Sequence, residues 1–255
     1  MAPLQGLRGI LFDIDGTLLQ NDRPIPGVRA MLDRLRASRL QFRLATNTTR
    51  RSRAAIASVL AAGDLPIPAA AILTPSLLAR RLILASGRER AALLIPAEAR
   101  VDLEGVVEDE RNPDWVVLGD LGRDFTFDRL NAALAWLRDG ARLLALQKNR
   151  SWYAGDEGWV LDAGAFVAAL EYAAGIEATL VGKPSTAFFD LALEEMGLPA
   201  TQVLVVGDDV ETDLAGGRAA GCRTALVKTG KYRGTEAELG PDRPDLVLES
   251  VADLL

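Results

Sequence analysis

Histidine is absent from this sequence of 255 residues, and cysteine occurs only once, as Cys222. Without histidine, the chain can form neither a Ser-His-Asp or Cys-His catalytic arrangement nor a His-ligated metal site. Catalysis would therefore depend on carboxylates, Lys, Ser/Thr or Tyr, and a metal would need oxygen ligands, which favours Mg²⁺, Mn²⁺ or Ca²⁺. A single cysteine excludes a disulfide within the chain, which is typical of a reducing compartment and predicts a cytoplasmic location. Because Cys222 begins an apolar run, we expect it to be a core residue.

Long apolar runs and clusters of basic residues are lacking as well. No segment reaches about 18 uninterrupted apolar residues, so no membrane span is expected, and residues 1–8 lack the apolar stretch of a signal peptide. The formal net charge is -6, and an acidic chain without a Lys/Arg cluster is a poor binder of nucleic acid. Neither Gly-x-Gly-x-x-Gly nor a Walker A pattern occurs, which excludes the glycine-rich nucleotide-binding loops.

Short apolar runs alternate with helical patterns at both ends of the chain. The expected strands are residues 7–12, 40–45, 178–181, 203–206, 224–227 and 245–248. The expected helices are residues 27–38, 51–62, 187–196 and 212–220. This alternation predicts an α/β domain with a mainly parallel sheet.

The middle of the chain repeats the pattern on its own. Strands are expected at residues 91–95, 115–118 and 142–146, and helices at residues 127–137 and 163–174. This region could continue one large sheet. We favour an inserted second domain at residues 78–179, with residues 1–77 and 180–255 as the core, because the residues suited to chemistry lie on both sides of it.

The first such segment is Asp13-Ile14-Asp15-Gly16-Thr17, directly after an apolar strand. Residues two apart on an extended chain face the same side, so Asp13 and Asp15 can converge where the strand ends. In open α/β sheets that end faces the ligand crevice. Asp and Gly are also common in plain turns, but the full run of five residues after an apolar strand favours a functional site.

Polar residues follow two further strands. Thr46-Asn47-Thr48-Thr49 offers hydroxyls, an amide and free backbone N–H groups for an anion, although the same residue types are preferred helix N-caps. Gly182-Lys183-Pro184 places a lysine at a strand end, where a fixed positive charge suits phosphate. A lone lysine is more often a solvated surface residue, so neither segment is decisive alone.

The fourth segment, residues 207–213, supplies several carboxylates after another apolar strand. It contains Asp208, Asp209 and Asp213. Acids at a helix start are also explained by N-capping and by the helix dipole, and for Asp213 this alternative stays open. The joint order along the chain is an acid pair, hydroxyls, a lysine and an acid pair, each after an apolar strand. Together these groups predict an all-oxygen metal site, a nucleophile and a phosphate-binding lysine.

In these four segments the sequence resembles the haloacid dehalogenase (HAD) superfamily, whose motifs occur in that order. The large insertion between Thr46 and Lys183 resembles the C2-type cap of the NagD-like branch. Position 48 is Thr where many members of the branch carry a second Asn, a local variation. The resemblance implies a Rossmann-like, doubly wound parallel sheet core with an inserted α/β cap domain.

The resemblance also implies a magnesium-dependent phosphatase. Asp13 would be the nucleophile that forms an aspartyl-phosphate, and Asp15 the general acid and base. Mg²⁺ would be bound by the Asp13 carboxylate, the Asp15 carbonyl and the Asp208 carboxylate, with Asp209 and Asp213 in support. The residues that hold the phosphoryl group would be Thr46, Asn47, Thr48 and Lys183.

The inserted domain would then act as a lid that excludes bulk water. Its candidate substrate contacts are Asn149, Arg150, Trp152 and Tyr153, although a Trp/Tyr pair more often serves packing. The expected partner is a small phosphorylated molecule rather than nucleic acid or a membrane, and a homodimer through the cap is expected from the resemblance.

Other reactions can be carried out on the same fold. A phosphomutase or phosphonate hydrolase would share Asp13 and the Mg²⁺ site, but these usually carry a different cap placed earlier in the chain. A dehalogenase needs neither Asp15 nor a metal. A non-catalytic phosphate sensor or scaffold is a different class of function, and metal-dependent turnover would separate it from an enzyme.

Overall fold

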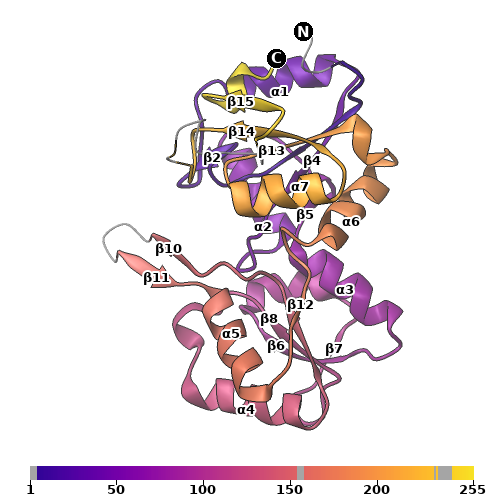
Figure 1. The fold of residues 1–255 in the computed structure, drawn as a ribbon, viewed down its shortest axis with the longest axis vertical. Coiled ribbons are helices and arrows are strands. Elements are labelled where there is room, and N and C mark those ends of the chain that lie inside the picture. The colour runs from indigo at the N-terminus through magenta and orange to yellow at the C-terminus, as the bar shows by residue number, and fades with distance from the viewer. Residues whose placement is uncertain (1–4, 154–157, 233, 235–242) are drawn as a thin grey trace. The chain divides into compact units, whose positions relative to one another are not determined.

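The computed structural model of the chain (Figure 1) describes residues 5–153, 158–232, 234 and 243–255. The chain divides into two compact units, each with its own sheet. Unit 1 comprises Met1–Thr46, Arg53–Leu73 and Lys183–Leu255, and unit 2 comprises Asn47–Ser52 and Thr74–Gly182. None of the described helices is long and apolar enough to cross a membrane.

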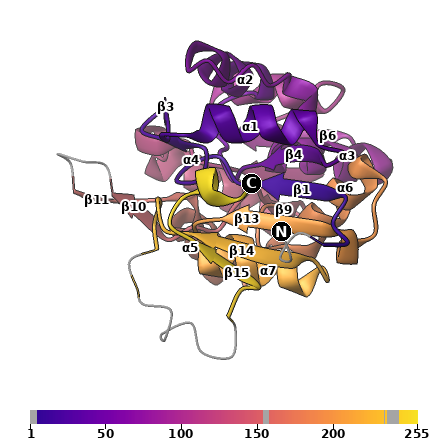
Figure 2. The same ribbon diagram turned by 90° about the horizontal axis from the view of Figure 1, so that it is seen from above.

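Unit 1 contains a six-stranded parallel sheet in the order β15-β14-β13-β1-β4-β5. Its strands are β1 (Gly9–Phe12), β4 (Gln41–Ala45), β5 (Ile72–Leu73), β13 (Val203–Gly207), β14 (Arg223–Val227) and β15 (Leu246–Leu248). Figure 2 shows β4, β1, β13 and β14 side by side. After β1 the chain adds β4 and then β5 on one side of that strand. On the other side of β1 it adds β13, then β14 and β15. The boundary between β1 and β13 is therefore the topological switch point, where open α/β sheets bind ligands.

Helices cover both faces of this sheet. They are α1 (Val28–Ala37), α2 (Arg53–Ala62), α6 (Thr186–Met196) and α7 (Ala215–Ala219). The buried residues of α1 share one apolar cluster with Ile10 and Val206 of the central strands. On the other face, Gly217 of α7 lies against Val205, and a Cβ at position 217 would come within 2.8 Å of that side chain. Strands buried on both faces explain the uninterrupted apolar runs in the sequence.

A turn, a β-ribbon and several short helices complete unit 1. The two-stranded ribbon pairs β2 (Leu19–Gln20) with β3 (Arg23–Pro24). The short helices are Ala69–Ala71, Ala200–Gln202, Val210–Leu214 and Val251–Asp253. The helix expected at residues 212–220 is in fact two elements, a π-helical turn at Val210–Leu214 followed by α7.

Unit 2 contains a five-stranded parallel sheet in the order β12-β9-β8-β6-β7. Its strands are β6 (Arg90–Leu94), β7 (Val107–Glu108), β8 (Trp115–Leu118), β9 (Arg142–Ala145) and β12 (Thr179–Leu180). Its helices are α3 (Pro75–Ala85), the 3₁₀ helix Ala97–Leu103, the 3₁₀ turn Gly122–Asp124, α4 (Phe127–Arg138) and α5 (Ala163–Ala174). The antiparallel ribbon of β10 (Ser151–Tyr153) and β11 (Trp159–Leu161) extends away from this sheet (Figure 1).

The two domain boundaries differ from those expected from the sequence, which lay at 77/78 and 179/180. Unit 2 begins at Thr74, because α3 packs as a whole against the 3₁₀ helix Ala97–Leu103 and the expected boundary would cut through α3. It ends at Gly182. The expectation that residues 178–181 form a strand among those of the core is wrong, because β12 pairs with β9 at the edge of the second sheet.

A second difference concerns the residues after β4. The sequence placed residues 46–49 together in the core, but Asn47–Ser52 belongs to unit 2. Within that unit the Thr49 hydroxyl accepts a hydrogen bond from the main-chain N–H of Asp120 at 2.8 Å. The sequence gives no sign of this contact, since it joins residues 71 positions apart.

Candidate active site

Asp13 and Asp208 follow the carboxyl ends of the two strands at the switch point. The main-chain N–H of Asp13 donates to the carbonyl of Val206 at 2.8 Å, which extends the pairing of β1 with β13 by one residue. Both side chains are buried. Because the carboxyl ends of parallel strands meet at one edge of a sheet, two acids that are 195 positions apart in the chain come together there.

Lys183 lies among these acids rather than on the surface. Its Nζ is 2.6 Å from Asp13 Oδ1, 2.6 Å from Asp213 Oδ1 and 3.1 Å from the carbonyl oxygen of Ala45. These three acceptors match the three N–H donors of an ammonium group. The side chain is 3% exposed, and a charge so deeply buried is tolerated because it is paired on two sides.

The acids carry more negative charge than Lys183 neutralises. If Asp13, Asp208 and Asp213 are all ionised, their -3 and the +1 of Lys183 sum to -2. Burial raises the pKa of Asp13 to about 6, with Asp208 and Asp15 adding to the rise and Lys183 opposing it. Burial likewise raises the pKa of Asp208 to about 6 and that of Asp213 to about 7. Burial alone would lower the pKa of Lys183, but the charges of Asp13 and Asp213 raise it above its ordinary value.

The donor set fits a hard divalent cation. Asp13, Asp208 and Asp213 each offer a carboxylate oxygen, and these three atoms lie within 4.8 Å of one another. Oxygen ligands are those that Mg²⁺ prefers, and a 2+ ion would balance the excess charge of -2. Asp213 already accepts from Lys183 through Oδ1 and from the main-chain N–H of Asp209 through Oδ2 at 3.2 Å. Asp13 and Asp208 are therefore the acids better placed to bind the cation directly.

Asp209 serves as a helix cap. Its Oδ1 accepts from the main-chain N–H groups of Glu211 at 3.0 Å and Thr212 at 3.2 Å, at the start of the π-helical turn. Its Oδ2 lies 2.9 Å from Nζ of Lys231. Burial would raise the pKa of Asp209, but Lys231 and the two N–H donors together lower it. N-capping, the alternative explanation for acids in this segment, thus applies to Asp209.

Asp15 differs from Asp13 in being exposed to solvent. The turn after it is held by hydrogen bonds from the N–H groups of Leu18 and Leu19 to the carbonyl of Ile14, both at 2.9 Å. Gly16 has φ 88°, a left-handed conformation that favours glycine. Asp15 and Asp13 thus lie two residues apart in different surroundings, one open to solvent and the other buried.

The predicted phosphate-binding residues fall in both units. Thr46 directly follows β4, is buried, and donates its main-chain N–H to the carbonyl of Leu73 at 3.1 Å. It adjoins Ala45, whose carbonyl oxygen accepts from Lys183, so Thr46 lies with the acids in unit 1. Asn47 and Thr48 belong to unit 2, and for them a place in the phosphate site stays a prediction.

The candidate substrate contacts of the cap lie in unit 2, after β9. Asn149 is held in place by its main-chain atoms: its N–H donates to the side chain of Gln147 at 2.5 Å, and its carbonyl accepts from Gly164 at 2.9 Å. Arg150 is exposed and Trp152 is 41% exposed. The side chain of Tyr153 lies outside the described part of the structure.

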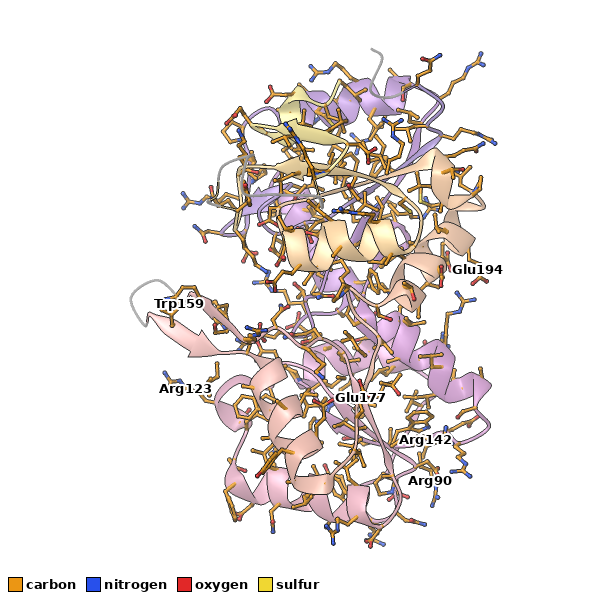
Figure 3. The ribbon with its side chains drawn as sticks, in the orientation of Figure 1. Arg90, Arg123, Arg142, Trp159, Glu177 and Glu194 are labelled. Atoms are coloured by element: carbon orange, nitrogen blue, oxygen red, sulfur yellow. The ribbon has the colours of Figure 1, made fainter. Side chains whose placement is uncertain are left out.

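The hairpin that carries Trp152 also exposes other apolar side chains. Trp159 of β11, labelled in Figure 3, is 75% exposed. Trp152 pairs across the ribbon with Val160. Trp152 and Trp159 are therefore not core residues of unit 2. Packing was the alternative to substrate contact for the Trp152/Tyr153 pair.

Sequence reasoning missed residues 229–231, which follow β14. The Thr229 hydroxyl donates to the carbonyl of Gly16 at 2.6 Å, and the main-chain N–H of Lys231 donates to Asp208 Oδ2 at 2.5 Å. The signal that could have found this segment is the one used elsewhere: polar residues directly after an apolar strand, here Lys, Thr, Gly and Lys at 228–231.

Comparisons with known proteins agree with the motifs. Residues 10–107 match the family described as "Haloacid dehalogenase-like hydrolase", and residues 180–254 match the one described as "HAD-hyrolase-like". The chain is 38% identical to haloacid dehalogenase-like hydrolase domain-containing protein 2 of Bos taurus over 250 residues, which is 98% of this chain and 95% of that protein. It is 34% identical to phospholysine phosphohistidine inorganic pyrophosphate phosphatase of Bos taurus over 256 residues, 98% of this chain and 93% of that protein.

Solved structures resemble the whole chain. A 4-nitrophenylphosphatase from Thermotoga maritima superimposes with a TM-score of 0.92 at 30% identity, covering 99% of this chain and 97% of that one. NagD from E. coli K-12 superimposes with a TM-score of 0.88 at 25% identity, covering 97% of this chain and 98% of that one. The similarity therefore extends over the sheet core and the inserted domain alike.

Proposed function

The chain belongs to the haloacid dehalogenase-like hydrolases, in their NagD-like branch, and from that premise we propose that it is a Mg²⁺-dependent phosphatase of small phosphate monoesters. The observation that carries the proposal is the position of Lys183, whose Nζ contacts Asp13 and Asp213 in a buried acid cluster. Such a cluster can bind a cation and a phosphate dianion together, because the cation and Lys183 offset the charges of both.

In the proposed mechanism, Asp13 attacks phosphorus through a carboxylate oxygen. The bond from phosphorus to the ester oxygen breaks, and Asp15 gives its proton to the departing oxygen. Asp15, now ionised, takes a proton from a water molecule, whose oxygen attacks the aspartyl-phosphate and releases Asp13 and inorganic phosphate. Bound Mg²⁺ supplies positive charge that reduces repulsion between the anionic nucleophile and the anionic substrate.

The remaining residues of the site orient these groups. Asp13 and Asp208 would hold Mg²⁺ through their carboxylates and Asp15 through its main-chain carbonyl, with Asp209 and Asp213 in support. The phosphoryl oxygens would be bound by Lys183, the Thr46 hydroxyl, Asn47 and Thr48. Donors fixed before the reaction stabilise the charge that spreads over these oxygens in the transition state.

The substrate class follows from chemistry and from the relatives. Two of the similar proteins are named for the hydrolysis of 4-nitrophenyl phosphate and of phospholysine, phosphohistidine and pyrophosphate. A small phosphorylated molecule is accordingly the proposed substrate, selected by cap residues that include Asn149 and Arg150. We extend the proposal to a cytoplasmic location, because the single Cys222 allows no internal disulfide, and to a homodimer formed through the cap.

The deciding experiment measures phosphate release from 4-nitrophenyl phosphate with Mg²⁺ and with EDTA, for the parent protein and for Asp13→Asn. We expect turnover that requires Mg²⁺ and is lost in Asp13→Asn, while circular dichroism shows the variant folded. Full activity of Asp13→Asn would refute the nucleophile. No turnover of any natural phosphate ester by a folded, Mg²⁺-bound parent would instead indicate the phosphate sensor.

A further inference from the structure

We propose that residues 229–231 position the Asp208 carboxylate for the divalent cation, which makes this segment a third part of the metal site beside the ends of β1 and β13. The inference rests on the proposed function, since it concerns the cation on which that function depends. The contacts that support the inference lie within unit 1 and join Asp208 to the described residues around it.

The first contact fixes one oxygen of Asp208. The main-chain N–H of Lys231 donates to Oδ2 at 2.5 Å. A donor on Oδ2 sets the rotation of the carboxylate and leaves Oδ1 as the oxygen that can bind a metal. Hydrogen bonds of this kind orient metal-binding carboxylates and tune the affinity of the site.

The second contact is steric. A Cβ at position 230 would overlap the Asp208 carboxylate, and so would a Cβ at position 16. A Cβ at position 16 would also come within 2.9 Å of the Gly230 Cα. Asp208 is thus enclosed between two glycines from separate loops. The φ of Gly230 lies outside the left-handed region, so glycine is required there by lack of space and not by backbone conformation.

Two further hydrogen bonds join residues 229–231 to the loop after β1 and to the loop after β13. The Thr229 hydroxyl donates to the Gly16 carbonyl at 2.6 Å, which ties it to the loop of Asp13 and Asp15. Nζ of Lys231 contacts Asp209 Oδ2 at 2.9 Å, which ties it to the loop of Asp208. The position of Asp208 therefore depends on a segment that supplies no side-chain ligand of its own.

The test is the dissociation constant of Mg²⁺, measured by isothermal titration calorimetry on the full chain without substrate. Gly230→Ala should raise this constant by about tenfold or more, as is usual when the partners of metal ligands are changed. Gly221→Ala is the matched control. Gly221 has φ 84° but nothing closer than 3.5 Å to an added Cβ, so its alanine variant should lose stability and keep the parent affinity for Mg²⁺.

A second pair of variants is milder. Thr229→Val removes the hydroxyl that holds Gly16 and should weaken Mg²⁺ binding, whereas Thr229→Ser keeps the hydroxyl and should bind as the parent does. Urea unfolding in EDTA separates these effects from a loss of stability, which by itself would leave the Mg²⁺ dissociation constant unchanged.

The outcomes distinguish the two proposals. If the parent binds Mg²⁺ and Gly230→Ala binds it equally well, the positioning role is overturned and the proposed function stands. If Gly230→Ala does not fold, an unchanged affinity in Thr229→Val overturns the role instead. If the parent itself does not bind Mg²⁺, the proposed function fails, and this inference fails with it.

Discussion

Lys183 and Asp213 form a buried ion pair, with 2.6 Å between Nζ and Oδ1 and side chains that are 3% and 2% exposed. The same Nζ contacts Asp13 at the same distance. Asp213 therefore supports the lysine that faces the proposed nucleophile, and the lysine offsets part of the charge that burial makes costly for both acids.

The first prediction concerns this pair. Asp213→Asn keeps the size of the side chain but removes its charge, so Lys183 loses an anionic partner. We expect a loss of about 1–3 kcal/mol in the free energy of unfolding, measured by urea denaturation at saturating Mg²⁺, where the cation keeps the acids of the cluster ionised. Lys183 would also be drawn more strongly to Asp13, so the phosphatase rate should fall.

The matched control is an exposed pair of similar length. Lys228 and Glu249 lie 2.7 Å apart, and the Glu249 side chain is 78% exposed. Because water screens such pairs, Glu249→Gln should cause no measurable change. An equally small effect of Asp213→Asn would contradict the stabilising role of the buried pair.

The second prediction is the pH dependence of stability without metal. The pKa values of Asp13 and Asp208 are raised from 3.8 to about 6, and that of Asp213 to about 7. The folded state therefore binds more protons than the unfolded state between these values. Stability from these groups is fully present below pH 3.8 and is lost as the pH rises through about 6 to 7.

Urea unfolding in EDTA at a series of pH values measures this loss. Asp13→Asn, which cannot titrate at that position, should show a shallower decline. Saturating Mg²⁺ should remove much of the decline, because a cation stabilises the ionised carboxylates. Stability of the metal-free parent that rises from about pH 4 to about pH 7 would contradict the raised pKa values.

The third prediction compares Asp208 with its neighbour Asp209. Asp208→Asn should weaken Mg²⁺ binding by about 100-fold or more, since it removes a charged ligand. Asp209→Asn should weaken it far less, because Oδ1 of Asp209 caps a helical turn and an amide oxygen can do the same. Calorimetric titration with Mg²⁺ checks both. Equal losses would show that Asp209 is itself a ligand.

These comparisons show why the sequence predicted some elements and not others. The ranges expected for β8 and α5 are confirmed to the residue, since a fully buried strand and a helix begun by an aspartate cap have strong local signals. Strand β12 has only two residues, and its pairing with β9 depends on long-range packing and not on a local sequence pattern. A run of four apolar or neutral residues cannot indicate which of two sheets it joins.

The candidate site divides in the same way. Strand-end acids and a lysine are visible in the sequence, because their side chains carry the chemistry. The role of the 229–231 segment depends on a main-chain N–H and on the missing side chain of Gly230, which any sequence could supply at many positions. The assignment of Asn47–Ser52 to unit 2 likewise depends on long-range packing, which no local pattern encodes.

The last prediction concerns the cap. Arg150 is exposed and follows Asn149, whose main-chain atoms are fixed by Gln147 and Gly164. Because these two bonds restrain the main chain beside Arg150, its contact with an anionic or polar substrate costs less entropy than the same contact from an unrestrained loop. Arg150→Ala should raise the KM of the best natural phosphate ester by about fivefold and leave kcat unchanged, as expected for a contact worth about 1 kcal/mol in both ground and transition states.

The control for this prediction is Arg129→Ala. Arg129 is also exposed, but it lies on α4, in the first turn of that helix, and not in the loop after β9. The same change in net charge should then leave KM as it is in the parent. A rise in KM in both variants would indicate a general effect of charge on substrate attraction, whereas no change in either would remove Arg150 from the substrate contacts. A rise in Arg150→Ala alone, together with a changed order of preference among several esters, would place the choice of substrate in the loop after β9.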